Sequence, residues 1–359
     1  MSRMINSSTC RRVSLDNPPV PADVLRDLAN YAGDVPADKY MTGELFDRLE
    51  SQVKELLGKE SAIYLPSGKL AQLAALKALT SRSGISRLAL HPRSHIEEYE
   101  ARSYQELWGM TSVHFGEYDR LPTAFDIHNF HEPIGAVVLE LPMRRLGCLL
   151  PSWEQLVAIT NAAHEKQIPI HMDGARLWES QPFYGKPLHE ISNLFDTLYV
   201  SFDKGLGGLA GGALAGPKSV IDEVKIWQRR AGGRVLRSFP NLLSSLKGLE
   251  ERLPQMAAFH EKAKSFAKSL VKIPGVRVSP EIPHANAFLV TLQGDTRKAV
   301  QARDRLAEEQ SIWLFDNVVD CIEQNTIRFE VTIRSAAFDI ESSEIKQAVI
   351  RFSELVQRQ

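Results

Sequence analysis

Short apolar segments that alternate with helical segments are the feature that most restricts how this chain can fold. Four of these apolar segments lie at residues 87–90, 135–141, 168–172 and 197–202. Helical spacing of apolar residues occurs between them, as over 152–167, where Ser152 is a favourable N-cap. Strands that alternate with helices form a mostly parallel sheet covered on both faces. Ligands of such sheets bind at the carboxyl ends of the strands.

The sequence also predicts how the chain is divided. Its 359 residues exceed what one small core usually covers, so we expect two domains. Residues 1–40 contain four prolines and are predicted to form an irregular N-terminal segment. A large α/β domain is expected over 41–245 and a smaller α+β domain over 246–359. The smaller domain is predicted to begin with one long helix over 248–270.

Charge and cysteine usage narrow the function classes. The formal net charge of −1 provides no electrostatic attraction to nucleic acid or to an anionic membrane. Three scattered cysteines, Cys10, Cys148 and Cys321, suit a reducing compartment better than a disulfide framework. The first residues lack the apolar core of a signal peptide, and no apolar stretch approaches the roughly 18 residues of a membrane helix. We therefore expect a cytoplasmic protein without nucleic-acid or membrane partners.

One buried segment ends on an aspartate. The apolar residues 168–170 lead through His171 and Met172 to Asp173. An unpaired ionised carboxylate costs several kcal/mol to bury or forces a pKa shift, so Asp173 needs a partner. The next buried segment ends at Asp203-Lys204, which precede six glycines between positions 205 and 216.

Three interpretations of the Lys204 segment are open. A dinucleotide-binding loop fits poorly, because the glycine spacing is off by one and a strand, not a helix, follows. A glycine-rich turn with a surface lysine is plausible for Lys204 alone. The third interpretation joins both segments: Lys204 forms a Schiff base with pyridoxal 5′-phosphate, and Asp173 pairs with the protonated ring nitrogen. A protonated ring is the better electron sink.

Three motifs carry a resemblance to a known family. They are "PSGKLAQ" (66–72), "HMDGARLWES" (171–180) and "SFDKGLGG" (201–208). Together they resemble the L-threonine aldolase and β-eliminating lyase family of fold-type I pyridoxal-phosphate enzymes. The resemblance implies a large domain of the aspartate-aminotransferase type with a mostly parallel seven-stranded sheet, plus a smaller C-terminal α+β domain. It also implies a homodimer or homotetramer with shared active sites.

The resemblance assigns roles around the reacting group. Lys204 matches the Schiff-base lysine and Asp173 the pyridinium partner. Arg176 falls where the family places an arginine near the substrate carboxylate; its alternative is a pairing with Asp173 or a turn cap. Arg328 in "TIRFEVTI" matches another carboxylate-binding arginine, with Arg334 as the competitor.

The phosphate of the cofactor is assigned to two segments. Ser67, Gly68 and Lys69 match the family's phosphate cup at a helix start, although the family commonly has Thr at the position of Lys69. In "AGGRVLRS" (231–238), Arg237 is the counterpart of an arginine that reaches the phosphate, and Arg234 is the alternative.

A histidine is predicted beside the ring. "HPRSHIEEYE" (91–100) resembles the family segment whose histidine stacks on the cofactor, which makes His95 the match and the candidate catalytic base. His91 has no counterpart, and His171 is expected to be a core residue.

The chain departs from the family after residue 140. Glu140 is kept, but a second histidine expected around Met143 is missing from "LELPMRRLGC". In the family that histidine lies beside the β-substituent of the substrate. Arg144 or Arg145 could face the same space and favour an acidic β-substituent, or both could be surface charges. Asp203 before the lysine is a second departure.

The predicted reaction is cleavage of β-hydroxy-α-amino acids, threonine-like substrates, to glycine and an aldehyde. The alternative is β-elimination from a β-substituted amino acid, begun by Lys204. A non-catalytic pyridoxal-phosphate protein is disfavoured, because Lys204, Asp173 and Arg176 occur together. A nicotinamide-dependent oxidoreductase is disfavoured by the glycine spacing.

Overall fold

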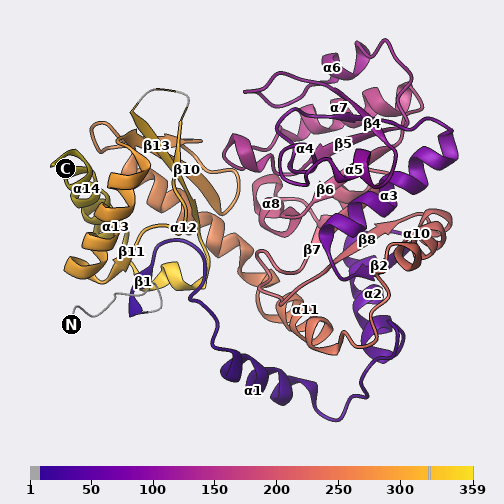
Figure 1. Cartoon of the computed structure of the whole chain (residues 1–359), viewed down its shortest axis with the longest axis horizontal. Coiled ribbons are helices and arrows are strands. Elements are labelled where there is room, and N and C mark those ends of the chain that lie inside the picture. Colours follow the sequence, from indigo (N-terminus) through magenta and orange to yellow (C-terminus); the bar gives the residue numbers. More distant parts are fainter. Residues whose placement is uncertain (1–8, 322, 324, 359) are drawn as a thin grey trace. The chain divides into compact units, whose positions relative to one another are not determined.

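The structure, a computed structural model, describes residues 9–321, 323 and 325–358 and contains two compact units (Figure 1). The large unit comprises Leu25–Leu146 and Leu150–Pro254, and the small unit comprises the described residues of Met1–Val24, Gly147–Leu149 and Gln255–Gln359. The units divide the chain after Val24 and after Pro254, whereas the domain boundaries predicted from the sequence lie after residues 40 and 245. The N-terminal residues join the small unit because β1 (Arg11–Arg12) pairs in parallel with β11 (Ile312–Trp313).

A seven-stranded sheet forms the centre of the large unit. Its order is β2-β8-β7-β6-β5-β3-β4. The strands are β2 (Ser61–Leu65), β3 (Arg87–Leu90), β4 (Thr111–His114), β5 (Ala136–Glu140), β6 (Ile170–Gly174), β7 (Thr197–Ser201) and β8 (Gly212–Gly216). The pairs among β3, β4, β5, β6 and β7 are parallel, and β8 runs antiparallel to both of its neighbours. The predicted mostly parallel seven-stranded sheet is confirmed.

Helices cover this sheet. They are α2 (Glu44–Leu57), α3 (Gly68–Ser83), α4 (His95–Glu98), α5 (Ser103–Glu106), α6 (Ala124–His128), α7 (Trp153–Glu165), α8 (Leu177–Tyr184), α9 (Leu188–Ser192), α10 (Lys218–Arg230) and α11 (Phe239–Glu251). Helix α3 is rich in Ala and Leu, packs across β5 to β8 and lies against α10 (Figure 1). Helix α2 packs on β2 and β8 with α9 and α11. The apolar side chains of α3 thus anchor its N-terminus beside the strand ends.

Two segments differ from the sequence expectation. The N-terminal segment is not wholly irregular, because α1 spans Pro21–Ala32. Proline is favourable in a first helical turn, and Gly33 follows the helix with φ of +55°. The long helix expected over 248–270 is interrupted: α11 ends at Glu251, a 3₁₀ turn covers Leu253–Gln255, and α12 covers Met256–Leu270. Pro254 lacks the N–H that a continuous helix requires.

The small unit is an α+β structure. Its sheet has the order β12-β13-β10-β9, with β9 (Arg277–Ser279), β10 (Ala287–Gln293), β12 (Val319–Asp320) and β13 (Thr326–Thr332) all in antiparallel pairs. Helices α12, α13 (Thr296–Gln310) and α14 (Ser342–Arg358), a 3₁₀ turn (Ser335–Asp339) and the β1-β11 pair complete it. Phe315, Phe329 and Phe352 pack in its core, with ring centroids 4.5 to 5.9 Å apart. Across the described part of the chain, the helices are too short or too polar to cross a membrane.

Candidate active site

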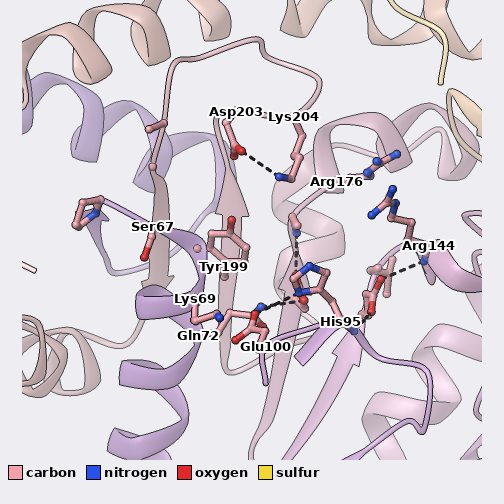
Figure 2. Close-up of a pocket in the computed structure, with 18 of the residues that line it drawn as sticks. Ser67, Lys69, Gln72, His95, Glu100, Arg144, Arg176, Tyr199, Asp203 and Lys204 are labelled. Atoms are coloured by element: carbon pink, nitrogen blue, oxygen red, sulfur yellow. Dashed lines mark hydrogen bonds and ion pairs between the residues drawn. The ribbon is translucent and has the colours of Figure 1, made fainter. Parts of the chain in front are cut away.

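The ends of three parallel strands bring polar residues together. Glu140 on β5 is the cross-strand neighbour of Asp173 on β6, which in turn lies beside Tyr199 on β7. A cavity of about 350 Å³ opens over them. It is lined by seven of the residues predicted from the sequence: Ser67, Gly68, Lys69, His95, Asp173, Arg176 and Lys204 (Figure 2). The carboxyl edge of the sheet is therefore where this candidate site forms, as expected for such sheets.

Asp173 is held by neutral donors. Its side chain is buried and accepts hydrogen bonds from the Gln72 amide at 2.9 Å and from the backbone N–H of Ala175 at 3.2 Å. Burial raises the pKa of Asp173. A cationic group bound beside this carboxylate would favour its ionised form. Gln72 was not predicted as a site residue, since nothing in its local sequence indicates its partner.

Lys204 lies just beyond the end of β7. Its ammonium group donates to the Asp203 carboxylate at 3.0 Å, and Ser201 donates to the same carboxylate through its hydroxyl. Burial opposes ionisation of Asp203, but Lys204 and these hydrogen bonds hold the pKa of Asp203 below its usual value. The unusual Asp203 is thus an ion-pair partner of the lysine.

The glycine-rich segment after Lys204 is not a dinucleotide-binding loop. It leads into strand β8, which pairs antiparallel with β7, and not into a helix. A Cβ on Gly212 would lie 2.5 Å from the Val200 carbonyl oxygen. Glycine is therefore required there for close packing between strands.

The predicted phosphate cup is the N-terminus of α3. Ser67 is the N-cap, and its hydroxyl accepts a hydrogen bond of 3.3 Å from the backbone N–H of Leu70. Gly68 rests against Tyr199, whose hydroxyl oxygen would lie 2.0 Å from an added Cβ. The first-turn N–H groups and the helix dipole make this end of a 16-residue helix suited to a phosphate.

His95 lies at the start of α4, held by two glutamates. Its backbone N–H donates to Glu140 at 2.8 Å, and its Nδ1 lies 3.2 Å from the buried Glu100 carboxylate. The hydrogen bond to Glu100 raises the pKa of His95 against the effect of burial, and the Asp173 charge adds to the increase. For Glu140, in contrast, burial itself raises the pKa, and the Asp173 charge contributes to the increase. Glu100 was not singled out from the sequence.

Four further predicted or alternative residues have partners within their own compact units. Arg237 is absent from the cavity lining of its own chain and donates to the Asp38 carbonyl at 2.6 Å. Arg234 donates to the Tyr40 carbonyl at 3.2 Å. Arg328 and Arg334 belong to the small unit; the first donates to Thr291 at 3.2 Å, and the second pairs with Asp16 at 3.4 Å.

The two other histidines considered in the sequence analysis, His171 and His91, have structural partners. His171 is buried in β6 with Nδ1 2.8 Å from the Thr197 hydroxyl, and burial lowers its pKa to about 3. It is the core residue that the sequence indicates. His91 is also buried, and its Nε2 contacts the carbonyls of Glu117 and Arg120 at 2.9 and 3.0 Å.

Arg144 and Arg145, which follow the family departure after residue 140, have different environments. Arg144 lines the cavity (Figure 2). Arg145 pairs with Glu98 at 2.8 Å and lies over the Tyr99 ring at 5.2 Å. Of the two alternatives left open by the sequence, Arg144 is the one that faces the cavity.

The residues of this cavity fit pyridoxal 5′-phosphate. A primary amine, a buried carboxylate and a helix N-terminus are the groups that its aldehyde, ring nitrogen and phosphate require. Gln72 and Glu100 both line the cavity. Their Oε1 and Oε2 atoms, respectively, are buried and accept no hydrogen bond from the described residues, so the cavity has two acceptors for a bound group. No group of His, Cys, Asp and Glu within the described ranges could hold a metal ion.

Known proteins are similar to most of this chain. The family model described as β-eliminating lyase matches residues 16–293. A solved structure from Listeria monocytogenes, provisionally named an L-allo-threonine aldolase, is 33% identical with a TM-score of 0.92, covering 98% of this chain and 100% of the other. One from Exiguobacterium sp., provisionally named an aromatic amino acid β-eliminating lyase/threonine aldolase, is 30% identical with a TM-score of 0.92, covering 98% and 99%. Low-specificity L-threonine aldolase 1 of Arabidopsis thaliana is 26% identical over 325 residues, 87% of this chain and 88% of that protein.

Proposed function

The chain belongs to the β-eliminating lyase family of fold-type I enzymes, and on that premise we propose that it cleaves β-hydroxy-α-amino acids to glycine and an aldehyde. One observation carries the proposal: Lys204, Asp173 and Arg176 line a single cavity together with His95. The names of its relatives in Arabidopsis thaliana and Listeria monocytogenes support aldol cleavage.

The cofactor of this family is pyridoxal 5′-phosphate, which when bound supplies a protonated pyridine ring that draws electrons from the breaking bond at Cα. Lys204 would bind its carbonyl carbon through Nζ. The Asp173 carboxylate would accept a hydrogen bond from its ring nitrogen, and Gln72 orients that carboxylate. Ser67 and the backbone at Gly68 and Lys69 would bind the phosphate.

Two side chains would act on the substrate. Arg176 binds the α-carboxylate, because a guanidinium makes two parallel hydrogen bonds to a carboxylate. His95 accepts the proton of the β-hydroxyl group, so that the oxygen can become the carbonyl of the released aldehyde. Glu100, 3.2 Å from His95 Nδ1, orients the imidazole and increases its basicity.

The proposal includes assembly and location. We propose a homodimer or homotetramer, supported by exposed apolar side chains at Leu25, Leu236 and Phe239. Light scattering on the purified protein would give the mass of the assembly and so the number of chains in it. A cytoplasmic location is supported by the free thiols of Cys10, Cys148 and Cys321, two of which are buried.

The test is product analysis with the cofactor-loaded protein. Threonine should yield glycine and acetaldehyde, and Lys204→Ala should abolish both the turnover and the visible absorption band of the lysine-bound cofactor. Lys218→Ala is the matched control, because Lys218 is exposed and pairs with Asp222. Release of a 2-oxo acid and ammonia without aldehyde would instead establish β-elimination, the alternative reaction.

A further inference from the structure

Helix α8 holds the chain on both sides of Lys204. Trp178 Nε1 donates a hydrogen bond of 2.8 Å to the carbonyl of Ser201, at the end of β7. The Glu179 carboxylate accepts a hydrogen bond of 2.9 Å from the backbone N–H of Gly205, the residue directly after the lysine. The two side chains are only 0% and 1% exposed. Two adjacent residues of one helix therefore fix the backbone before and after Lys204.

The contact between Glu179 and Gly205 leaves no room for a side chain at position 205. A Cβ on Gly205 would lie 2.6 Å from the carboxyl carbon of Glu179 and 2.6 Å from its Oε1. Hydrogen bonds from a backbone N–H to an ionised carboxylate are roughly twice as strong as those between neutral groups. The buried carboxylate and the backbone at Gly205 thus hold each other in place.

Hydrogen bonds within the loop complete the restraint. The N–H of Gly207 donates to the Lys204 carbonyl at 3.1 Å, and the N–H of Gly208 donates to the Phe202 carbonyl at 2.7 Å. The Lys204 side chain is 40% exposed and lines the cavity (Figure 2). The reach of this long side chain towards a bound group therefore depends on where the loop places its backbone.

The same segment also carries two other groups of the site. Asp173 lies in β6, and Arg176 is the N-cap of α8. Residues 173–179 thus supply the proposed partner of the ring nitrogen, the proposed carboxylate-binding arginine and the support of the lysine. A misplacement of 1 Å can slow a reaction about a hundredfold, so the position of the lysine relative to Asp173 matters for its chemistry.

We propose that Glu179 is a positioning residue, which acts through the backbone of Gly205 to hold Lys204 in place for the cofactor. The inference rests on the proposed function. In the linkage step, the Lys204 nitrogen bonds to the aldehyde carbon of pyridoxal 5′-phosphate, and the aldehyde oxygen leaves as water with both hydrogens of the amine. A displaced Nζ slows this step, while the groups that bind the ring and the phosphate stay in place.

The decisive measurement separates linkage from the binding that precedes it. Cofactor-free protein is mixed rapidly with increasing pyridoxal 5′-phosphate, and the visible band of the lysine-bound cofactor is followed. The limiting rate reports linkage to Lys204, and the half-saturating concentration reports the preceding binding. In Glu179→Leu the limiting rate should fall about tenfold to a hundredfold, with the half-saturating concentration close to that of the wild type. Glu179→Gln keeps an oxygen acceptor and should recover most of the rate.

Two further variants separate positioning from a general loss of stability. Gly205→Ala forces the same carboxylate away and should also lower the limiting rate, which decides the question if Glu179→Leu does not fold. Ile127→Ala is the control, because Ile127 is buried in α6 outside the cavity lining, and its truncation destabilises the fold by opening a cavity. Its limiting rate should equal that of the wild type.

Unchanged limiting rates in Glu179→Leu and Gly205→Ala would overturn the inference, and so would an equal decrease in Ile127→Ala. A wild type that forms the band but does not cleave β-hydroxy amino acids would end the proposed function, and the limiting rates would still decide the role of Glu179. A wild type that forms no band would overturn both.

Discussion

Gln72 donates a hydrogen bond of 2.9 Å from its side-chain amide to the carboxylate of Asp173, a residue 101 positions further along the chain. Gln72 lies in the second turn of α3, and Asp173 lies near the end of β6. The helix whose first turn forms the predicted phosphate cup therefore also orients the carboxylate predicted to bind the ring nitrogen. One helix packed across the sheet thus sets the position of two cofactor contacts.

Replacing Gln72 should weaken cofactor binding. In Gln72→Leu the buried Asp173 carboxylate loses a side-chain donor, and hydrogen bonds to charged groups are worth about 1.5–3 kcal/mol. We expect the dissociation constant for pyridoxal 5′-phosphate to rise roughly tenfold to a hundredfold, measured by titrating the cofactor-free protein and following absorbance. Gln228→Leu is the control, because its buried amide donates to the Tyr64 carbonyl at 3.1 Å, outside this cavity. Equal affinities in the wild type and Gln72→Leu would rule out this role.

Glu100 should set the acid limb of the pH profile. Its carboxylate favours the protonated form of His95 and raises the pKa of that histidine, whereas the proposed base must be neutral. In Glu100→Gln the pKa of His95 falls, so the decline of kcat/KM towards acid should move to lower pH. Profiles for β-hydroxy amino acid cleavage measure this shift. Glu106→Gln, at an exposed position, should leave the profile unchanged. An unmoved limb in Glu100→Gln would mean that another group titrates there.

The sequence predicts the centre of the fold because each element carries its own local signal. The segment 152–167 has helical spacing and a serine at its start, and α7 begins at Trp153 with the Ser152 hydroxyl accepting from Gln155 at 3.2 Å. The apolar segments 87–90 and 197–202 correspond to β3 and β7. The alternation of these elements then leaves few sheet arrangements, and Asp173 and Lys204 fall at one edge.

The remaining features depend on contacts that local patterns do not encode. The bond between Gln72 and Asp173 joins distant positions, and the contact of Tyr199 with Gly68 requires knowledge of how α3 crosses β7. Helix α1 was missed because prolines suggest interruption, although Pro21 occupies the start of the helix, where proline is tolerated. The positions of Arg237 and Arg328 followed from the family resemblance alone, and their predicted roles stay predictions.

Gly68 should not tolerate a side chain. A Cβ at this position would lie 2.0 Å from the Tyr199 hydroxyl oxygen and 2.4 Å from Cζ of the same ring, so α3 or the ring must shift. Overpacking of this kind costs typically 1–3 kcal/mol. We expect Gly68→Ala to lower the free energy of unfolding by about this amount and to weaken cofactor binding, measured by urea denaturation and by cofactor titration. Ser81→Ala, on an exposed position of the same helix, should change neither quantity. Unchanged stability in Gly68→Ala would contradict this packing.

His171 should make the fold sensitive to acid. It is fully buried beside Thr197, and burial lowers its pKa to about 3, against roughly 6.5 in an unfolded chain. Between these values the unfolded state binds a proton that the folded state does not, so the stability that neutral His171 allows is present above pH 6.5 and falls as the pH drops. His171→Gln should reduce the slope of unfolding free energy against pH by about 1.4 kcal/mol per unit in this window, measured by urea denaturation. His128→Gln, at an exposed site, should keep the wild-type slope; the same slope in His171→Gln would show that His171 is not the group responsible.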